Sequence, residues 1–139
     1  MPQRSLRALS VSFRVCLAWA AVLTAVFWFF GDTFAGLIAS DERVRDEAGH
    51  YLRVVAPSLW GYGFTIVAAA AFNGIGRAER GFAYYVVRCA VFYVPAALLA
   101  TQGNDPALVF SAIAAANVLS GVTVAVYALR WLRLATENP

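Results

Sequence analysis

Three polar side chains interrupt long apolar stretches of the sequence: Arg88, Asn117 and Asn73. A charged side chain in the core of a bilayer costs about 2.5–3.5 kcal/mol on insertion scales. Either the surroundings of Arg88 reduce this cost, or its charge has a function that justifies it. Its long stem can carry the guanidinium to the headgroups, or a polar group on another helix can pair with it. Alternatively, Arg88 lies on the path of a substrate or ion. The two amides predict hydrogen bonds between helices.

The residue patterns of catalysis and metal binding are absent from the sequence. Cys16 and Cys89 lie in apolar segments without the spacing of a metal or redox site, and His50 stands alone. There is no phosphate-binding glycine loop. The predicted membrane cores, which in the second helix begin only at about Leu52, contain no Asp or Glu, whereas a cation-coupled transporter usually has a carboxylate near mid-membrane. We therefore predict no enzyme, no cofactor, no metal site and no coupling site of the usual kind in this chain.

The elements that carry the polar residues follow from the composition. The 139 residues are 61% hydrophobic and 14% charged, with a mean hydropathy of +0.66. Because one helix needs about 20 apolar residues to cross a bilayer core, the chain has room for four crossings and short loops. We predict an all-α polytopic membrane helix bundle, a single membrane domain over residues 1–139. Its four transmembrane helices are expected at about 9–30, 43–73, 80–101 and 106–133.

Turn and capping residues set the expected ends of these helices. Gly31-Asp32 predicts a break after the first apolar run. Asp41 predicts the N-cap of the second helix, and Asp105-Pro106 predicts an N-cap followed by proline at the first helical position.

Two prolines and two rows of small residues bear on how the helices pack. Pro57 and Pro95 fall inside the second and third predicted helices, where each is expected to bend the helix. Small and polar residues recur at four-residue spacing on the second and fourth helices: Gly61, Thr65, Ala69 and Asn73; Ala112, Ala116 and Ser120. Such rows let helices approach closely, so they are either packing ridges or, in the other interpretation, the lining of a cavity. Asn117 lies beside the second row.

The net charge of +3 comes from eleven arginines, with no lysine. The arginines lie near helix ends rather than along one stripe, so nucleic-acid binding is not predicted. Seven of them gather at the N-terminus, in the loop after the second helix and at the C-terminus, whereas the opposite ends carry most of the acidic residues and only Arg43, Arg45 and Arg53. The positive-inside rule then predicts a multi-pass protein of the inner or plasma membrane with both termini in the cytoplasm.

A series of short motifs follows in a fixed order along the chain. An acidic stretch, Asp41-Glu42-Arg43-Val44, precedes Ala48, Tyr51-Leu52 and Pro57; a helix end, Asn73-Gly74-Ile75-Gly76-Arg77, precedes Arg88, Val94-Pro95 and Ala116-Asn117. This order resembles the C-terminal portion of MATE (multidrug and toxic compound extrusion) transporters. The resemblance covers about residues 10–135.

The resemblance implies that the chain corresponds to the last four helices of a twelve-helix fold, in which two lobes surround a central cavity. It implies secondary active efflux of drugs or toxic organic compounds, including small organic cations, by antiport with Na⁺ or H⁺. The family's acidic ion-binding positions fall in helices outside this sequence, so none of them is carried over. We expect a truncated portion that does not transport alone, or one that needs the N-terminal helices as a separate chain.

Two alternatives stay open at this point. Lipid-linked oligosaccharide flippases share the general two-lobe fold, although the helix end from Asn73 to Arg77 favours MATE transporters. A self-standing four-helix membrane scaffold or assembly protein would need nothing beyond the rows of small residues.

Overall fold

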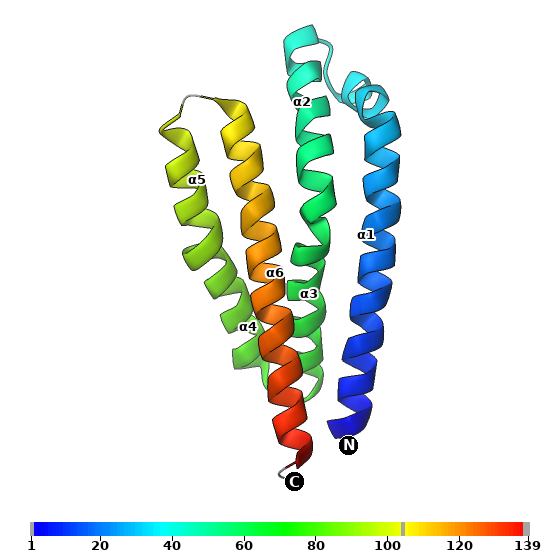
Figure 1. The fold of residues 1–139 in the computed structure, drawn as a ribbon, viewed down its shortest axis with the longest axis vertical. Helices are drawn as coiled ribbons and strands as arrows, with labels where there is room; N and C mark the ends of the chain where they lie inside the picture. Colours follow the sequence, from blue (N-terminus) through cyan, green and yellow to red (C-terminus); the bar gives the residue numbers. More distant parts are fainter. Residues whose placement is uncertain (1, 104, 138–139) are drawn as a thin grey trace.

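The computed structural model describes residues 2–103 and 105–137, and all regular structure in these ranges is helical. Four helical stretches are long and apolar enough to cross a membrane: Arg4–Ile38, Glu42–Gly74, Ala78–Thr101 and Pro106–Ala135. They run alternately up and down, so both ends of the chain lie at the same end of the bundle (Figure 1). We call this the terminal end. The predicted all-α membrane helix bundle is confirmed.

Two of the four crossings change their helical winding on the way. The first crossing is α1 (Pro2–Ile38). The second consists of α2 (Glu42–Val55), the 3₁₀ turn η1 (Ala56–Ser58) and α3 (Leu59–Gly74). The third consists of α4 (Ala78–Val87), the π-helical segment η2 (Arg88–Tyr93) and α5 (Val94–Thr101). The fourth is α6 (Pro106–Glu137).

Helix α1 continues through Gly31-Asp32, so the predicted break is wrong. A glycine in a helix costs only about 1 kcal/mol relative to alanine, and no proline here blocks the backbone hydrogen bonds. Tertiary contacts outweigh that cost: Gly31 is buried where α1 packs on α2, and Asp32 forms an ion pair with Arg53 of α2. Asp32 therefore lies in the last two turns of a continuous helix rather than in a loop after it.

The predicted caps are confirmed. The Asp41 side chain accepts a hydrogen bond from the Val44 N–H at 3.2 Å, and the Asp105 side chain accepts one from the Ala107 N–H at 2.9 Å. Each carboxylate satisfies one of the free N–H groups at a helix start.

Helix α3 ends in a turn that needs a glycine. Gly76 has a φ of 76°, the Arg77 N–H donates to the Phe72 carbonyl at 2.8 Å, and the Gly76 N–H donates to the Asn73 carbonyl at 3.1 Å. This pair of bonds is the Schellman arrangement, which closes the carbonyl end of a helix. The sharp turn sends the chain directly into α4.

The aromatic core of the bundle lies toward the terminal end. Phe72 is fully buried, with its ring centroid 5.4 Å from that of Tyr84 in α4 and 5.0 Å from that of Trp131 in α6. Phe13 of α1 stacks on Phe64 of α3 at 4.3 Å. These contacts join all four crossings. The polar residues of the bundle interior lie farther from the terminal end, beyond this aromatic core.

Candidate functional site

A chain of polar side chains crosses the middle of the bundle. The Arg88 Nη2 donates to the Asn117 Oδ1 at 2.7 Å, the Asn117 Nδ2 donates to the Ser58 Oγ at 3.1 Å, and the Ser58 Oγ donates to the Val55 carbonyl at 2.7 Å. Asn117 is 3% exposed and Ser58 is 3% exposed, while Arg88 is half-buried. We call Arg88, Asn117 and Ser58 the central cluster. It links the second, third and fourth crossings through side chains alone.

Arg88 is held in place rather than extended toward the headgroups. It lies ten residues beyond the start of α4 at Ala78, a rise of about 15 Å along the helix. Its guanidinium carbon lies 4.3 Å from the ring centroid of Tyr62 and 5.4 Å from that of Tyr93, within the range of cation–π attraction. Of the two structural explanations open from the sequence, the structure shows pairing.

The positive charge of Arg88 has no carboxylate beside it in the described part of the chain, where the ion pairs are Arg53–Asp32 and Arg77–Glu79. The Arg88 Nε is buried and lacks a hydrogen-bond partner among these residues. Aromatic faces and one amide oxygen attract a cation but do not neutralise it. The uncompensated charge of Arg88 therefore allows the central cluster to bind a negatively charged group of a ligand.

A close crossing of α3 and α6 fixes Asn117. A Cβ added at Gly61 would overlap the backbone of Asn117, and one added at Gly121 would overlap the backbone of Gly61. Thr65, Ala116 and Ser120 around this crossing are also buried. The small residues on these faces thus pack helix against helix, as one of the two interpretations of the rows predicts.

The π-helical turn of η2 begins at Arg88 itself. In this segment the Val94 N–H donates to the Cys89 carbonyl, five residues back. Pro95 follows, and a proline ring inside a helix clashes with the carbonyl four residues earlier, here that of Val91. Widening the turn relieves this clash, which explains why the winding changes just before Pro95. Single π turns of this kind often accompany functional sites.

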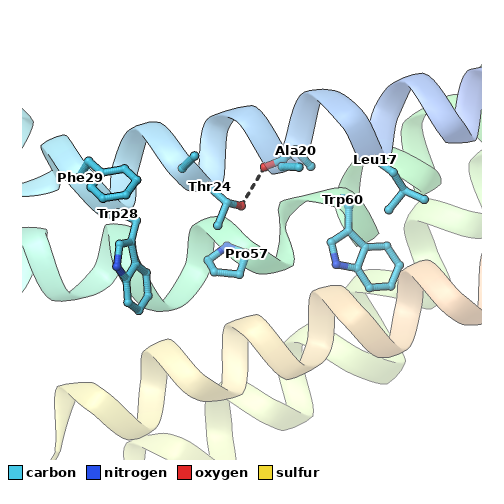
Figure 2. A pocket seen from close by; sticks show the side chains of 9 residues that line it. Leu17, Ala20, Thr24, Trp28, Phe29, Pro57 and Trp60 are labelled. Atoms are coloured by element: carbon cyan, nitrogen blue, oxygen red, sulfur yellow. Dashed lines mark hydrogen bonds between the residues drawn. The ribbon is translucent and has the colours of Figure 1, made fainter.

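Pro57 and Asn73 lie outside the central cluster. Pro57 is exposed within the 3₁₀ turn η1 and lines a cavity of about 430 Å³ between α1 and the second crossing (Figure 2). That cavity is apolar: the Thr24 Oγ1 already donates to the Ala20 carbonyl at 2.7 Å, and Trp28 and Trp60 form its walls. Asn73 is exposed at the end of α3, and its Oδ1 lies beside Gly81 of α4.

Four residues of this region were not predicted from the sequence: Ser58, Tyr62, Tyr93 and Gly121. Ser58 follows Pro57, and serine next to a helix-bending proline often accepts or donates a local backbone bond, which is the signal that could have identified it. The two tyrosines carry no such signal, because aromatic residues are frequent throughout this sequence.

Comparisons with known proteins identify the family. A sequence model of the MatE family matches residues 1–99. This chain belongs to the MatE family. The crystal structure of the Vibrio cholerae MATE transporter VcmN in the bent form has the same fold. It matches with a TM-score of 0.82 and 20% sequence identity, over 91% of this chain and 30% of that chain.

A relative with an assigned cargo is the FAD transporter of Shewanella oneidensis, which is 25% identical over 121 residues. The match covers 87% of this chain and 27% of that protein. The chain therefore spans less than a third of the length of these MATE relatives. Membership in a transporter family agrees with the prediction of a membrane-embedded transport protein rather than an enzyme.

Proposed function

We propose that this chain supplies the last four helices of a MATE-type secondary transporter that exports organic compounds in exchange for Na⁺ or H⁺. The observation that supports the proposal is the central cluster, a polar group of side chains held at mid-bundle in a transporter fold. Polar residues at this depth are expensive, and in membrane proteins they mark the paths of substrates and ions. Alternating exposure of such a site to the two sides of the membrane is how secondary transporters work.

In this proposal the coupling cation binds outside the chain. Asp32 is the carboxylate that α1 carries into the first crossing, and its partner is Arg53. An arginine that already pairs with a carboxylate competes with Na⁺ for the same oxygens. We therefore assign coupling to helices of the transporter beyond these four, and both termini of this chain to the cytoplasmic face of the inner membrane.

The test is export by an efflux-deficient bacterial strain. One strain produces this chain alone, and a second produces it together with the preceding helices of a MATE transporter, on one polypeptide or two. We expect the second strain to survive higher concentrations of cationic drugs such as ethidium and the first to gain nothing. Resistance from the chain alone would contradict the need for further helices. No export from either strain would contradict the transport role.

A second candidate cargo is an organic anion such as FAD, the compound named for the Shewanella relative. The uncompensated charge of Arg88, with Tyr62 and Tyr93 beside it, favours this candidate: a guanidinium binds phosphate, and tyrosine rings stack on planar groups. Flavin released into the medium, measured by fluorescence, distinguishes the two. If the cargo is anionic, Arg88→Gln abolishes flavin release, whereas an ethidium transporter loses little or improves when the cation is removed.

A further inference from the structure

A second cavity, of about 270 Å³, lies between α4 and α6 near the terminal end of the bundle. Its walls include Arg80, Tyr84 and Val87 of α4 and Thr123 and Tyr127 of α6. None of these residues belongs to the central cluster. We call it the α4–α6 cavity.

The end of this cavity nearest the chain termini is cationic and polar. The Arg80 guanidinium lies 4.7 Å from the ring centroid of Trp131, and its Nη1 lies 3.5 Å from the Tyr127 hydroxyl, at the limit of a hydrogen bond. Among the described residues Arg80 has no carboxylate partner. The Tyr84 side chain is 7% exposed, and its hydroxyl is buried without a hydrogen-bond partner in the same residues. The Tyr84 hydroxyl thus lacks an acceptor, and the only acceptor that the described residues offer to the Arg80 guanidinium is the Tyr127 hydroxyl.

The other end of the cavity is apolar. Ala83, Val87 and Val124 form its walls. The helix rises by about 10 Å from Arg80 to Val87. The cavity therefore extends from its cationic end to the apolar interior of the bundle. A ligand that fits must carry a negative group at one end and hydrocarbon at the other.

The position of Arg80 along the bundle matches the headgroup layer of a membrane. Arg80 is the third residue of α4, at the end of the bundle where both chain ends lie (Figure 1). Trp131, beneath its guanidinium, is a residue type that concentrates at the membrane–water interface. Basic pockets between transmembrane helices at this depth bind acidic lipid headgroups.

We propose that the α4–α6 cavity binds one anionic phospholipid, with its phosphate on Arg80 and the Tyr84 hydroxyl and one acyl chain along Val87 and Val124. The charge of Arg80, the unpaired Tyr84 hydroxyl and the direction of the apolar walls all fit this ligand. The site is separate from the central cluster, so the inference stands whether the cargo is a cation or an anion. Its role is to brace α4 against α6 at the membrane surface.

Native mass spectrometry of the full chain in mild detergent tests the proposal. The protein is mixed with equal amounts of phosphatidylglycerol and phosphatidylcholine that have the same acyl chains. We expect the wild type to retain one phosphatidylglycerol in preference to phosphatidylcholine. Arg80→Gln lowers that preference by about fivefold, the effect of one basic residue at a membrane surface. Arg130→Gln is the matched control, because it removes an exposed arginine from the same end of the bundle.

Two further variants test headgroup binding and acyl-chain binding separately. They also keep the test valid if Arg80→Gln does not fold. Tyr84→Phe removes only the hydroxyl and is expected to weaken the headgroup preference. Ala83→Leu narrows the cavity and is expected to reduce retention of phosphatidylglycerol without changing charge. Helical circular dichroism and gel-filtration profiles confirm that each variant is folded.

Three results would overturn the proposal. Equal retention of the two lipids by the wild type would show that no headgroup is recognised. Equal losses in Arg80→Gln and Arg130→Gln would show diffuse attraction rather than a site. Displacement of the lipid by millimolar inorganic phosphate would show that the acyl chain contributes nothing and that a free anion is the ligand.

Discussion

Helices α3 and α6 cross with their backbones in contact at Gly61 and Gly121, whereas η2 and α5 lie against the same helix α6 with nearly all of their residues exposed or only partly buried. The faces around the first contact are buried, including Thr65 and Ser120 at 1% exposure or less. In η2 no described residue is buried, and in α5 only Ala100 is. A directional link from Arg88 to Asn117 ties η2 to α6.

The difference separates a rigid part of the bundle from a part that can shift. Close-packed backbones resist sliding, because any displacement creates overlap or a void. A helix held by a polar link and a few side chains can move once that link is exchanged for another partner. In the transport function proposed above, cargo that binds Arg88 would make such an exchange and would free the third crossing to move.

The largest effect should come from disturbing the close crossing. Gly61→Ala places a methyl group into the backbone of α6, which we expect to cost about 1–3 kcal/mol of unfolding free energy. Gly74→Ala is the matched control, because it makes the same change in the same helix where no other atom lies within 4 Å. Unfolding in bicelles by added SDS, followed by circular dichroism, measures both. Equal stabilities would show that the crossing is looser than described.

A smaller effect is expected from cutting the polar link. Asn117→Leu leaves the Arg88 guanidinium and the Ser58 hydroxyl without their partner, at a cost of about 1–2 kcal/mol. Asn73→Leu makes the same substitution at an exposed position and should change stability little.

A double-mutant cycle with Arg88→Met then measures the link itself. We expect a coupling of about 0.6–1.7 kcal/mol between positions 88 and 117, the range of hydrogen bonds between helices in a bilayer. A coupling near zero would mean that the two side chains do not hold η2 against α6.

The smallest effect is expected at the ion pair between the first and second crossings. Asp32 and Arg53 are both well exposed, with 69% and 40% of their side-chain areas accessible. Asp32→Asn should therefore change the unfolding free energy by less than about 1 kcal/mol. The same SDS titration at low and high salt checks this. If Asp32→Asn lowered the unfolding free energy as much as Gly61→Ala does, the contact between α1 and α2 would be the more rigid part of the bundle.

Much of the fold was predictable because membrane crossing imposes a simple rule of length and polarity. The number of crossings and the caps at Asp41 and Asp105 follow from local chemistry. Pro57 and Pro95 predict disturbed helices, although as bends rather than as the 3₁₀ and π turns that the structure shows. The continuation of α1 beyond Gly31 does not, because contacts with α2 decide it and these contacts are invisible in a local pattern.

Two members of the central cluster, Arg88 and Asn117, were predictable as residues, whereas Ser58 and the geometry of the cluster were not. The sequence identifies Arg88 and Asn117 by their cost in an apolar segment. That they bind each other depends on the rotation of two helices whose residues lie 29 positions apart. The π turn begins at Arg88 and rotates the residues that follow it relative to α4, and no residue pattern before Pro95 predicts it. The position of the Tyr62 ring beside the Arg88 guanidinium likewise depends on how the helices pack.

The π turn at η2 also has a consequence for reading related sequences. A π turn holds one residue more than the α turn it replaces, so α5 is rotated by about 100° relative to a continuous helix. A relative that lacks one residue between Val87 and Pro95 would keep an arginine at the level of Asn117 but turn a different side of α5 toward its neighbours. Leu98 and Leu99, exposed here, would exchange places with inward-facing positions. Alignments of this family should therefore allow a one-residue gap within 88–93. The number of residues in this segment determines which side of α5 faces the rest of the bundle.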